Sequence, residues 1–94
     1  MKIVWTARAR RNLRDAARCV MHFNPTAALA IVQTIRAAPA QLTQFPASGR
    51  PGQIEGTREL LVGSTDYILP YRMQDDVIEI LAVVHTSRRW PDQL

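Results

Sequence analysis

Residues 57–90, TRELLVGSTDYILPYRMQDDVIEILAVVHTSRRW, decide the fold of this chain, because they predict three consecutive strands and then a basic, aromatic tail. The expected strands are rich in β-branched and aromatic residues and cover Leu60–Val62, Tyr67–Met73 and Val77–Val84. Short polar turns separate them, at residues 63–66 and at residues 75–76. Three strands joined in this way predict an antiparallel meander.

Two features of the meander refine this prediction. The last strand is apolar on both faces except at Glu79, which is the pattern of a central strand covered by helices on one side. Pro70 lacks the N–H group that a strand ladder needs, so it predicts a bulge or a locally unpaired edge in the middle strand.

The residues before this segment predict one strand and two helices. Ile3–Trp5 has strand character, and Thr6 is suited to cap a helix whose apolar residues recur at helical spacing. Asn24-Pro25 then ends the first helix and begins the second, because Asn24 can cap it and proline suits a first turn. Pro39 predicts a kink, after which another turn reaches Gln44.

The connector from Phe45 to Gly56 contains three glycines and two prolines in twelve residues, so we expect it to be irregular. The predicted order of elements is therefore β-α-α-β-β-β. The sequence predicts a single α+β domain over residues 1–94, with a helical hairpin packed on a small, mainly antiparallel sheet.

Length and composition favour a small cytoplasmic protein that works with a partner. A domain of 94 residues buries roughly 60–65 % of its unfolded surface, so its stability is marginal and a tightly bound partner can add to it. No apolar run approaches the roughly 20 residues of a membrane span. Cys19 is the only cysteine, which excludes a disulfide framework, and its place in the helical pattern predicts a small core residue.

The positive charge is concentrated in the amino-terminal half and consists almost entirely of arginine. Lys2 is the only lysine, against eleven arginines. Residues 1–22 hold six basic side chains and one acidic one, a net charge of +5, whereas residues 54–79 hold two basic and six acidic ones, a net charge of −4. This asymmetry predicts an acidic partner, either nucleic acid or an acidic protein segment, unless the arginines are merely a solvated helix face.

Several residues near the strand ends are candidates for chemistry or binding. Cleaving RNA requires a base, an acid and positive charge on the phosphate, and His85 can supply proton transfer while arginines such as Arg72 and Arg88 supply charge. The alternative is that these arginines pair with acids such as Glu59. Trp90 suits either a binding hot spot or a cover over the edge of the core. No metal-ligand spacing or phosphate-binding glycine loop is present, so we expect no cofactor and no metal.

Taken in order, the segments of this chain resemble those of the RelE/ParE superfamily of bacterial type II toxins, and the resemblance covers nearly all of it. The matching segments are Trp5 with Ala9 and Leu13, Asn24-Pro25 with Ala27-Ala28, residues 42–46, 49–52 and 56–60, Tyr67-Ile68 with Tyr71-Arg72, residues 77–85, and Arg88-Arg89-Trp90.

Two activities occur in this superfamily, and a few positions separate them. RelE-like members cleave messenger RNA in the ribosome with an arginine directly after the first tyrosine of the third strand, where this chain has Ile68. A second arginine of those members falls at about Ser87 here, and their terminal catalytic tyrosine has no counterpart. Residues 67–72 and 85–89 are instead similar to ParE-like members, which have no known catalytic centre and inhibit DNA gyrase by binding.

The resemblance therefore implies a ParE-like toxin that binds DNA gyrase, traps cleaved DNA and arrests growth, with a role in plasmid stabilisation. It also implies a cognate antitoxin that wraps the helical hairpin and the sheet. We expect the target-facing residues to be Arg58, Arg72, His85, Arg88, Arg89 and Trp90. We expect the antitoxin-facing residues to be Arg11, Leu13, Arg14, Arg18, Val20 and Val32.

Two alternatives stay open at this point. One is a ribosome-dependent, metal-independent mRNA endoribonuclease that uses Arg72, His85 and Arg88. The other is a decayed family member that only binds its antitoxin.

Overall fold

The computed structural model describes residues 1–88, 90 and 91, which form two α-helices, one 3₁₀ helix and a mixed sheet. The elements follow in the order β1 (Lys2–Trp5), α1 (Ala7–Phe23), α2 (Pro25–Ala37), the 3₁₀ helix η1 (Ala38–Thr43), β2 (Arg50–Pro51), β3 (Arg58–Val62), β4 (Tyr67–Gln74), β5 (Val77–Ile80) and β6 (Val84–His85). The strands lie in the order β1-β5-β4-β3-β2, with β6 beside the first residues of β4. Strands β1 and β5 run parallel, and the other neighbours run antiparallel.

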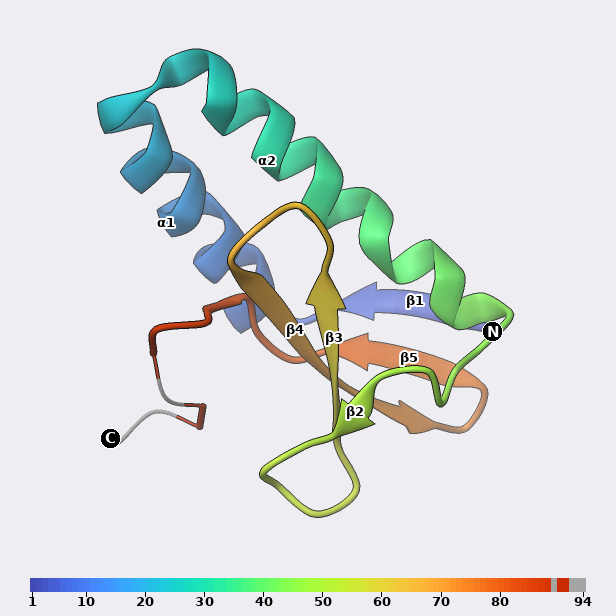
Figure 1. Ribbon diagram of the computed structural model, residues 1–94. Coiled ribbons are helices and arrows are strands. Elements are labelled where there is room, and N and C mark those ends of the chain that lie inside the picture. The colour runs from blue at the N-terminus through green and yellow to red at the C-terminus, as the bar shows by residue number, and fades with distance from the viewer. Residues whose placement is uncertain (89, 92–94) are drawn as a thin grey trace.

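Figure 1 shows the helices as a hairpin whose turn lies at the end away from the strands. The predicted α+β fold, a helical hairpin packed on a mainly antiparallel sheet, is confirmed.

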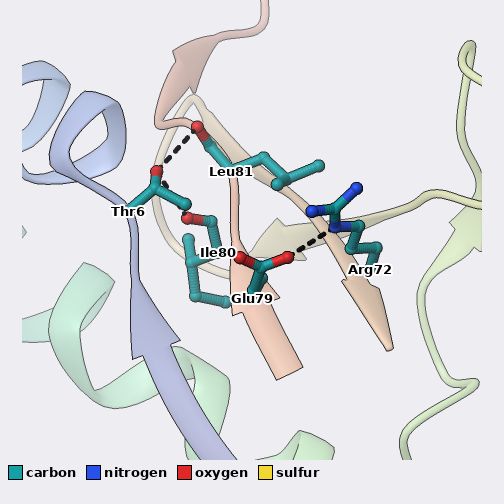
Figure 2. Close-up of polar contacts among 5 residues, drawn as sticks. All are labelled: Thr6, Arg72, Glu79, Ile80 and Leu81. Atoms are coloured by element: carbon teal, nitrogen blue, oxygen red, sulfur yellow. Dashed lines mark hydrogen bonds and ion pairs between the residues drawn. The ribbon is translucent and has the colours of Figure 1, made fainter. Parts of the chain in front are cut away.

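Side-chain caps begin both helices, as predicted. Thr6 Oγ1 accepts a hydrogen bond from the Ala9 N–H at 3.1 Å, and Asn24 Oδ1 accepts one from the Ala27 N–H at 3.1 Å. The Thr6 hydroxyl also lies 3.0 Å from the carbonyl oxygen of Ile80 and 3.2 Å from that of Leu81 (Figure 2), so it joins the start of α1 to the end of β5. The predicted kink at Pro39 is confirmed, because α2 ends at Ala37 and the chain continues as η1.

The last strand is divided, and the prediction of one strand over Val77–Val84 was wrong in this respect. Strand β5 pairs with the second half of β4 and β6 pairs with its first two residues, so three residues, 81–83, lie opposite only Leu69 and Pro70. Pro70 is the physical cause, because it has no N–H to donate to the last strand. The bulge predicted at Pro70 is thus present. The Pro70 carbonyl still accepts a hydrogen bond from the Leu81 N–H at 2.8 Å.

The connections between strands are mostly those the sequence predicts. Asp75 and Asp76 both have positive φ, 52° and 63°, which is the conformation of a two-residue hairpin turn. The connector after η1 is not wholly irregular, however, because Arg50 and Pro51 form the short strand β2 beside Arg58 and Glu59 of β3.

The main core lies between the helical hairpin and one face of the sheet. It consists of Ala9, Leu13, Ile35, Leu42, Leu60, Val62, Leu69, Tyr71, Ile78, Ile80 and Val83. A second, smaller cluster of Ile68, Ala82 and Val84 lies apart from it. Cys19 is exposed, so its predicted place in the core was wrong. Neither α-helix in the described part of the chain has the length and apolar character needed to cross a membrane.

Candidate functional site

The sheet face opposite the helices carries a row of apolar side chains across three strands. Leu61 of β3 lies beside Ile68 of β4, and Ile68 lies beside Val84 of β6. Alternate residues of a strand point to opposite faces, so this row is separate from the main core. Trp90 packs against the cluster of Ile68, Ala82 and Val84 and covers it. The tail therefore lies on the sheet and does not extend into solvent at Trp90.

Trp90 also contacts the first turn of α1. The guanidinium carbon of Arg8 lies 4.8 Å from the centre of the indole ring, which is a cation–π contact. Contacts of this kind are worth about 0.5–2 kcal/mol, depending on how far they are withdrawn from water. The indole Nε1 is buried and finds no hydrogen-bond acceptor among residues 1–88, 90 and 91.

An open cavity of about 490 Å³, which we call the Trp90 pocket, lies beside this indole. Its lining residues are Arg50, Gln53, Glu59, Ile68, Thr86, Arg88, Trp90 and Pro91. Two of its charges neutralise each other, because Arg50 Nε donates to Glu59 Oε1 at 2.9 Å. The remaining cation is Arg88, which is exposed. The pocket thus combines the apolar side chains of Ile68 and Trp90 with polar groups, and its charged residues, Arg50, Glu59 and Arg88, sum to +1. A mixed apolar and polar lining of this kind is suited to contact with a protein.

Connector residues 46–49 directly precede Arg50, which lines this pocket, and two side chains hold them. The Tyr71 hydroxyl donates to the Pro46 carbonyl at 2.7 Å and accepts from the Gly49 N–H at 3.0 Å. Arg58 donates to the carbonyl oxygens of Ala47 at 3.2 Å and Gly49 at 2.8 Å. Arg58, predicted to face the target, therefore has its guanidinium engaged with the connector backbone.

His85 belongs to β6, beside the first residue of β4, and faces α1. Its Nδ1 accepts a hydrogen bond from the Ser87 N–H at 3.1 Å and lies 2.8 Å from Ser87 Oγ. Because Nδ1 accepts from the backbone, the neutral ring carries its proton on Nε2. The ring also meets Tyr67 edge to face, with centres 5.3 Å apart. An open cavity of about 280 Å³ there is lined by both rings and by Arg88.

The Tyr67 hydroxyl in this second cavity is a hydrogen-bond donor and not a base at neutral pH. Burial raises the pKa of the phenol above its ordinary value, the Cys19 thiol adds to this effect, and Arg88 acts against it. A proton acceptor for RNA cleavage would need a pKa nearer to neutrality.

The structure brings His85 and Arg88 together but separates Arg72 from them. His85 lies directly opposite Tyr67, on the face that meets the helices. Arg72 is five residues further along β4, about 16 Å at the rise of a strand, and points to the other face. Its guanidinium pairs with Glu79 on β5 (Figure 2). Arg89, the other predicted target-facing arginine, lies outside the described residues.

The predicted antitoxin-facing residues divide between core and surface. Leu13 is buried, Val20 and Val32 are partly buried, and Arg11, Arg14 and Arg18 are exposed along α1.

Of these residues, Arg14 and Leu13 also line an open cavity of about 530 Å³ beside β1, which we call the basic groove. Ile3, Val4 and Trp5 form its apolar floor, and Arg10 and Arg36 join Arg14 at its rim. Arg10 and Arg36 were not among the residues predicted from the sequence. The spacing of Arg10 and Arg14, one helical turn, indicates that these two share a face.

The described residues hold no group of three histidine, cysteine or acidic side chains close enough to bind a metal ion.

Comparison with known proteins agrees with this geometry. Residues 3–90 match the family described as ParE toxin of type II toxin-antitoxin system, parDE. The chain is a member of the ParE toxin family. It is a toxin of the type II toxin-antitoxin class within the wider RelE/ParE superfamily.

Individual relatives support the same assignment. The protein Y4kP of Sinorhizobium fredii is 44 % identical over 93 residues, which are 99 % of this chain and 96 % of that protein. In the structure of the chromosomal ParDE system of P. aeruginosa, a chain of 27 % identity has a TM-score of 0.80, over 90 % of this chain and 95 % of its own. In the toxin-antitoxin complex RelBE2 of Mycobacterium tuberculosis, a chain also of 27 % identity has a TM-score of 0.57, with 89 % and 88 % covered.

Proposed function

We propose that this ParE-family toxin arrests growth by binding DNA gyrase and trapping cleaved DNA, without acting on RNA itself. The observation that carries the proposal is Ile68, which is buried under Trp90 at the position where a RelE-like nuclease is expected to have an arginine. The hydrocarbon side chain of Ile68 cannot stabilise the charge that develops on a phosphate during cleavage, as an arginine at this position would. A gyrase target also requires a cytoplasmic protein.

The arrangement of the candidate catalytic residues supports the same conclusion. Tyr67 of β4 lies opposite His85, and Arg72 is about 16 Å further along β4 and points to the other face of the sheet. One substrate phosphate therefore cannot contact both His85 and Arg72. The Nδ1 atom of His85 is occupied by Ser87. The higher TM-score with the ParDE structure, 0.80 against 0.57 for the RelBE2 complex at equal identity, further favours the ParE branch.

The proposed target surface is the face that carries Trp90, Arg88 and the exposed Leu61. It combines a large aromatic side chain, a cation and an apolar row, which are features of protein-binding hot spots. Arg58 acts here through the connector that it holds.

The test is to induce the toxin in cells and to follow DNA and messages in parallel. We expect DNA breaks covalently attached to gyrase, together with intact messages. Cuts at codon positions in translated messages, with intact DNA, would reject the proposal and favour the endoribonuclease alternative.

We also propose that a cognate antitoxin neutralises the toxin by placing an acidic, amphipathic segment in the basic groove. Three arginines at the rim attract acidic side chains, and the apolar floor accepts apolar ones. The floor belongs to β1, an edge strand whose outer side can pair with an added strand.

The matched pair Arg14→Glu and Arg11→Glu tests the groove, because both arginines are exposed on α1 but only Arg14 lines the groove. We expect Arg14→Glu to weaken binding of the antitoxin about tenfold or more and Arg11→Glu to change it by less than about threefold. Equal effects of the two changes would show that the antitoxin senses only overall charge.

A further inference from the structure

The turn of the helical hairpin carries three large apolar side chains that are largely exposed. Met21 is 55 % exposed, Phe23 80 % and Leu29 63 %. All three lie close in sequence to the junction of α1 and α2, and this junction is the end of the hairpin away from the strands (Figure 1). Single exposed apolar residues are common, but a phenyl ring that is 80 % exposed at the end of a projecting element is well placed to contact a partner. We call this group the hairpin tip.

Local hydrogen bonds hold the backbone of the hairpin tip, and a ring contact orients Phe23. Asn24 is the single residue between the two helices; its N–H donates to the Val20 carbonyl at 2.7 Å and its side chain accepts from the Ala27 N–H at 3.1 Å. The ring of His22 meets the Phe23 ring edge to face, with centres 5.1 Å apart. A side chain that is already oriented loses little conformational entropy on binding, so it is an efficient anchor.

The hairpin tip contains no acidic residue and has an arginine near it in the sequence. No aspartate or glutamate occurs between Asp15 and Glu55, whereas Arg18 lies five residues before Phe23 and His22 directly precedes it. Arg18 and His22 are both exposed. A partner surface complementary to this one therefore has an apolar pocket for the Phe23 ring and acidic residues at the rim of that pocket.

The shape of the hairpin tip selects between the two partners of a toxin. A projecting ring needs a concave receptor, which a folded target protein offers and an extended antitoxin segment does not. The basic groove has the opposite shape and suits such a segment. We propose that the hairpin tip inserts Phe23 into an apolar pocket with an acidic rim on the folded target; this rests on the proposed function in that the toxin arrests growth by binding.

The test compares Phe23→Ser with the matched control Phe45→Ser in the full-length toxin. Phe45 is also largely exposed, at 64 %, but follows η1 and lies outside the hairpin. Both variants are measured by graded induction of growth arrest, by binding to purified DNA gyrase, and by co-purification with antitoxin, with circular dichroism as the check on folding. Loss of a hot-spot aromatic weakens binding by about thirtyfold or more. We expect a loss of this size for Phe23→Ser, with antitoxin binding retained, and no change for Phe45→Ser.

Several results would overturn the proposal. These are growth arrest by Phe23→Ser at the wild-type level of induction, loss of antitoxin binding by this variant, weakened binding to duplex DNA alone, or a wild-type dimer that Phe23→Ser converts to a monomer. If the wild type arrests growth without binding gyrase, the gyrase assignment fails, yet relief of arrest by Phe23→Ser still supports the hairpin tip. A wild-type chain that does not arrest growth contradicts both proposals.

Discussion

The hydroxyl of Tyr71 is expected to be one of the most important single groups for the stability of this toxin. Tyr71 is fully buried, and its hydroxyl bonds both Pro46 and Gly49. Tyr71→Phe keeps the ring but removes both hydrogen bonds, each worth about 0.5–1.5 kcal/mol, and leaves the buried Gly49 N–H without an acceptor. We therefore predict a loss of about 2–3 kcal/mol in the free energy of unfolding. In a domain of this size, such a loss lowers Tm by roughly 10–20 °C.

Urea unfolding followed by circular dichroism, together with thermal melts, measures this loss directly. The matched control is Tyr67→Phe, because the Tyr67 hydroxyl has no hydrogen-bond partner within residues 1–88, 90 and 91, and we expect it to change stability by less than about 0.5 kcal/mol. If Tyr71→Phe is as stable as Tyr67→Phe, the hydroxyl does not hold the connector. Residues 46–49 must then be held by the Arg58 guanidinium, with the β2–β3 pairing holding the residues that follow.

Three further changes test the same region by unfolding measurements. Gly49→Ala is expected to lower the free energy of unfolding by about 2 kcal/mol or more, because its Cβ would lie 2.7 Å from the Tyr71 ring. In the control Gly63→Ala the new Cβ has no atom within 4 Å, so this change should be neutral. Similar losses for both variants would contradict the close packing at Gly49. Trp90→Ala should cost about 2–3 kcal/mol, below the value for a fully buried tryptophan, and an unchanged Tm would mean that the indole does not cover its cluster. Arg50→Ala leaves the carboxylate of Glu59, which is only 5 % exposed, without its partner. We expect a loss of about 1–2 kcal/mol in the free energy of unfolding, less than for a fully buried pair, because Arg50 is 63 % exposed and water screens the interaction. Adding Glu59→Gln should recover part of this loss, and purely additive effects of the two changes would argue against the pair.

Local signals in the sequence account for most of the fold. Thr6 and Asn24 have the side chains that cap helices, and each does so through a hydrogen bond three residues away. Asp75 and Asp76 tolerate the positive φ of a tight hairpin. Pro70 predicts the break in the last strand because it has no N–H to donate. These features depend only on near neighbours, so one sequence is enough to predict them.

Features that depend on distant contacts could not be predicted in the same way. Arg8 and Trp90 are at opposite ends of the chain, and only the folded sheet and α1 bring them together. Arg58 donates to backbone carbonyls of the connector. Every residue has a backbone carbonyl, so the residue types do not indicate which carbonyls Arg58 contacts. Pairing of Arg50 with the buried Glu59 likewise requires the short strand β2, whose two residues carry too little pattern to be recognised.

Supercoiling of relaxed plasmid by purified gyrase, titrated with purified toxin in the absence of ribosomes, tests the central claim most directly. We predict that the toxin inhibits supercoiling or accumulates cleaved plasmid, that stoichiometric antitoxin reverses the effect, and that Trp90→Ala weakens it. Supercoiling that continues unchanged at high toxin concentration, while the same preparation cuts messages on translating ribosomes, would show that the toxin is a nuclease and not a gyrase inhibitor.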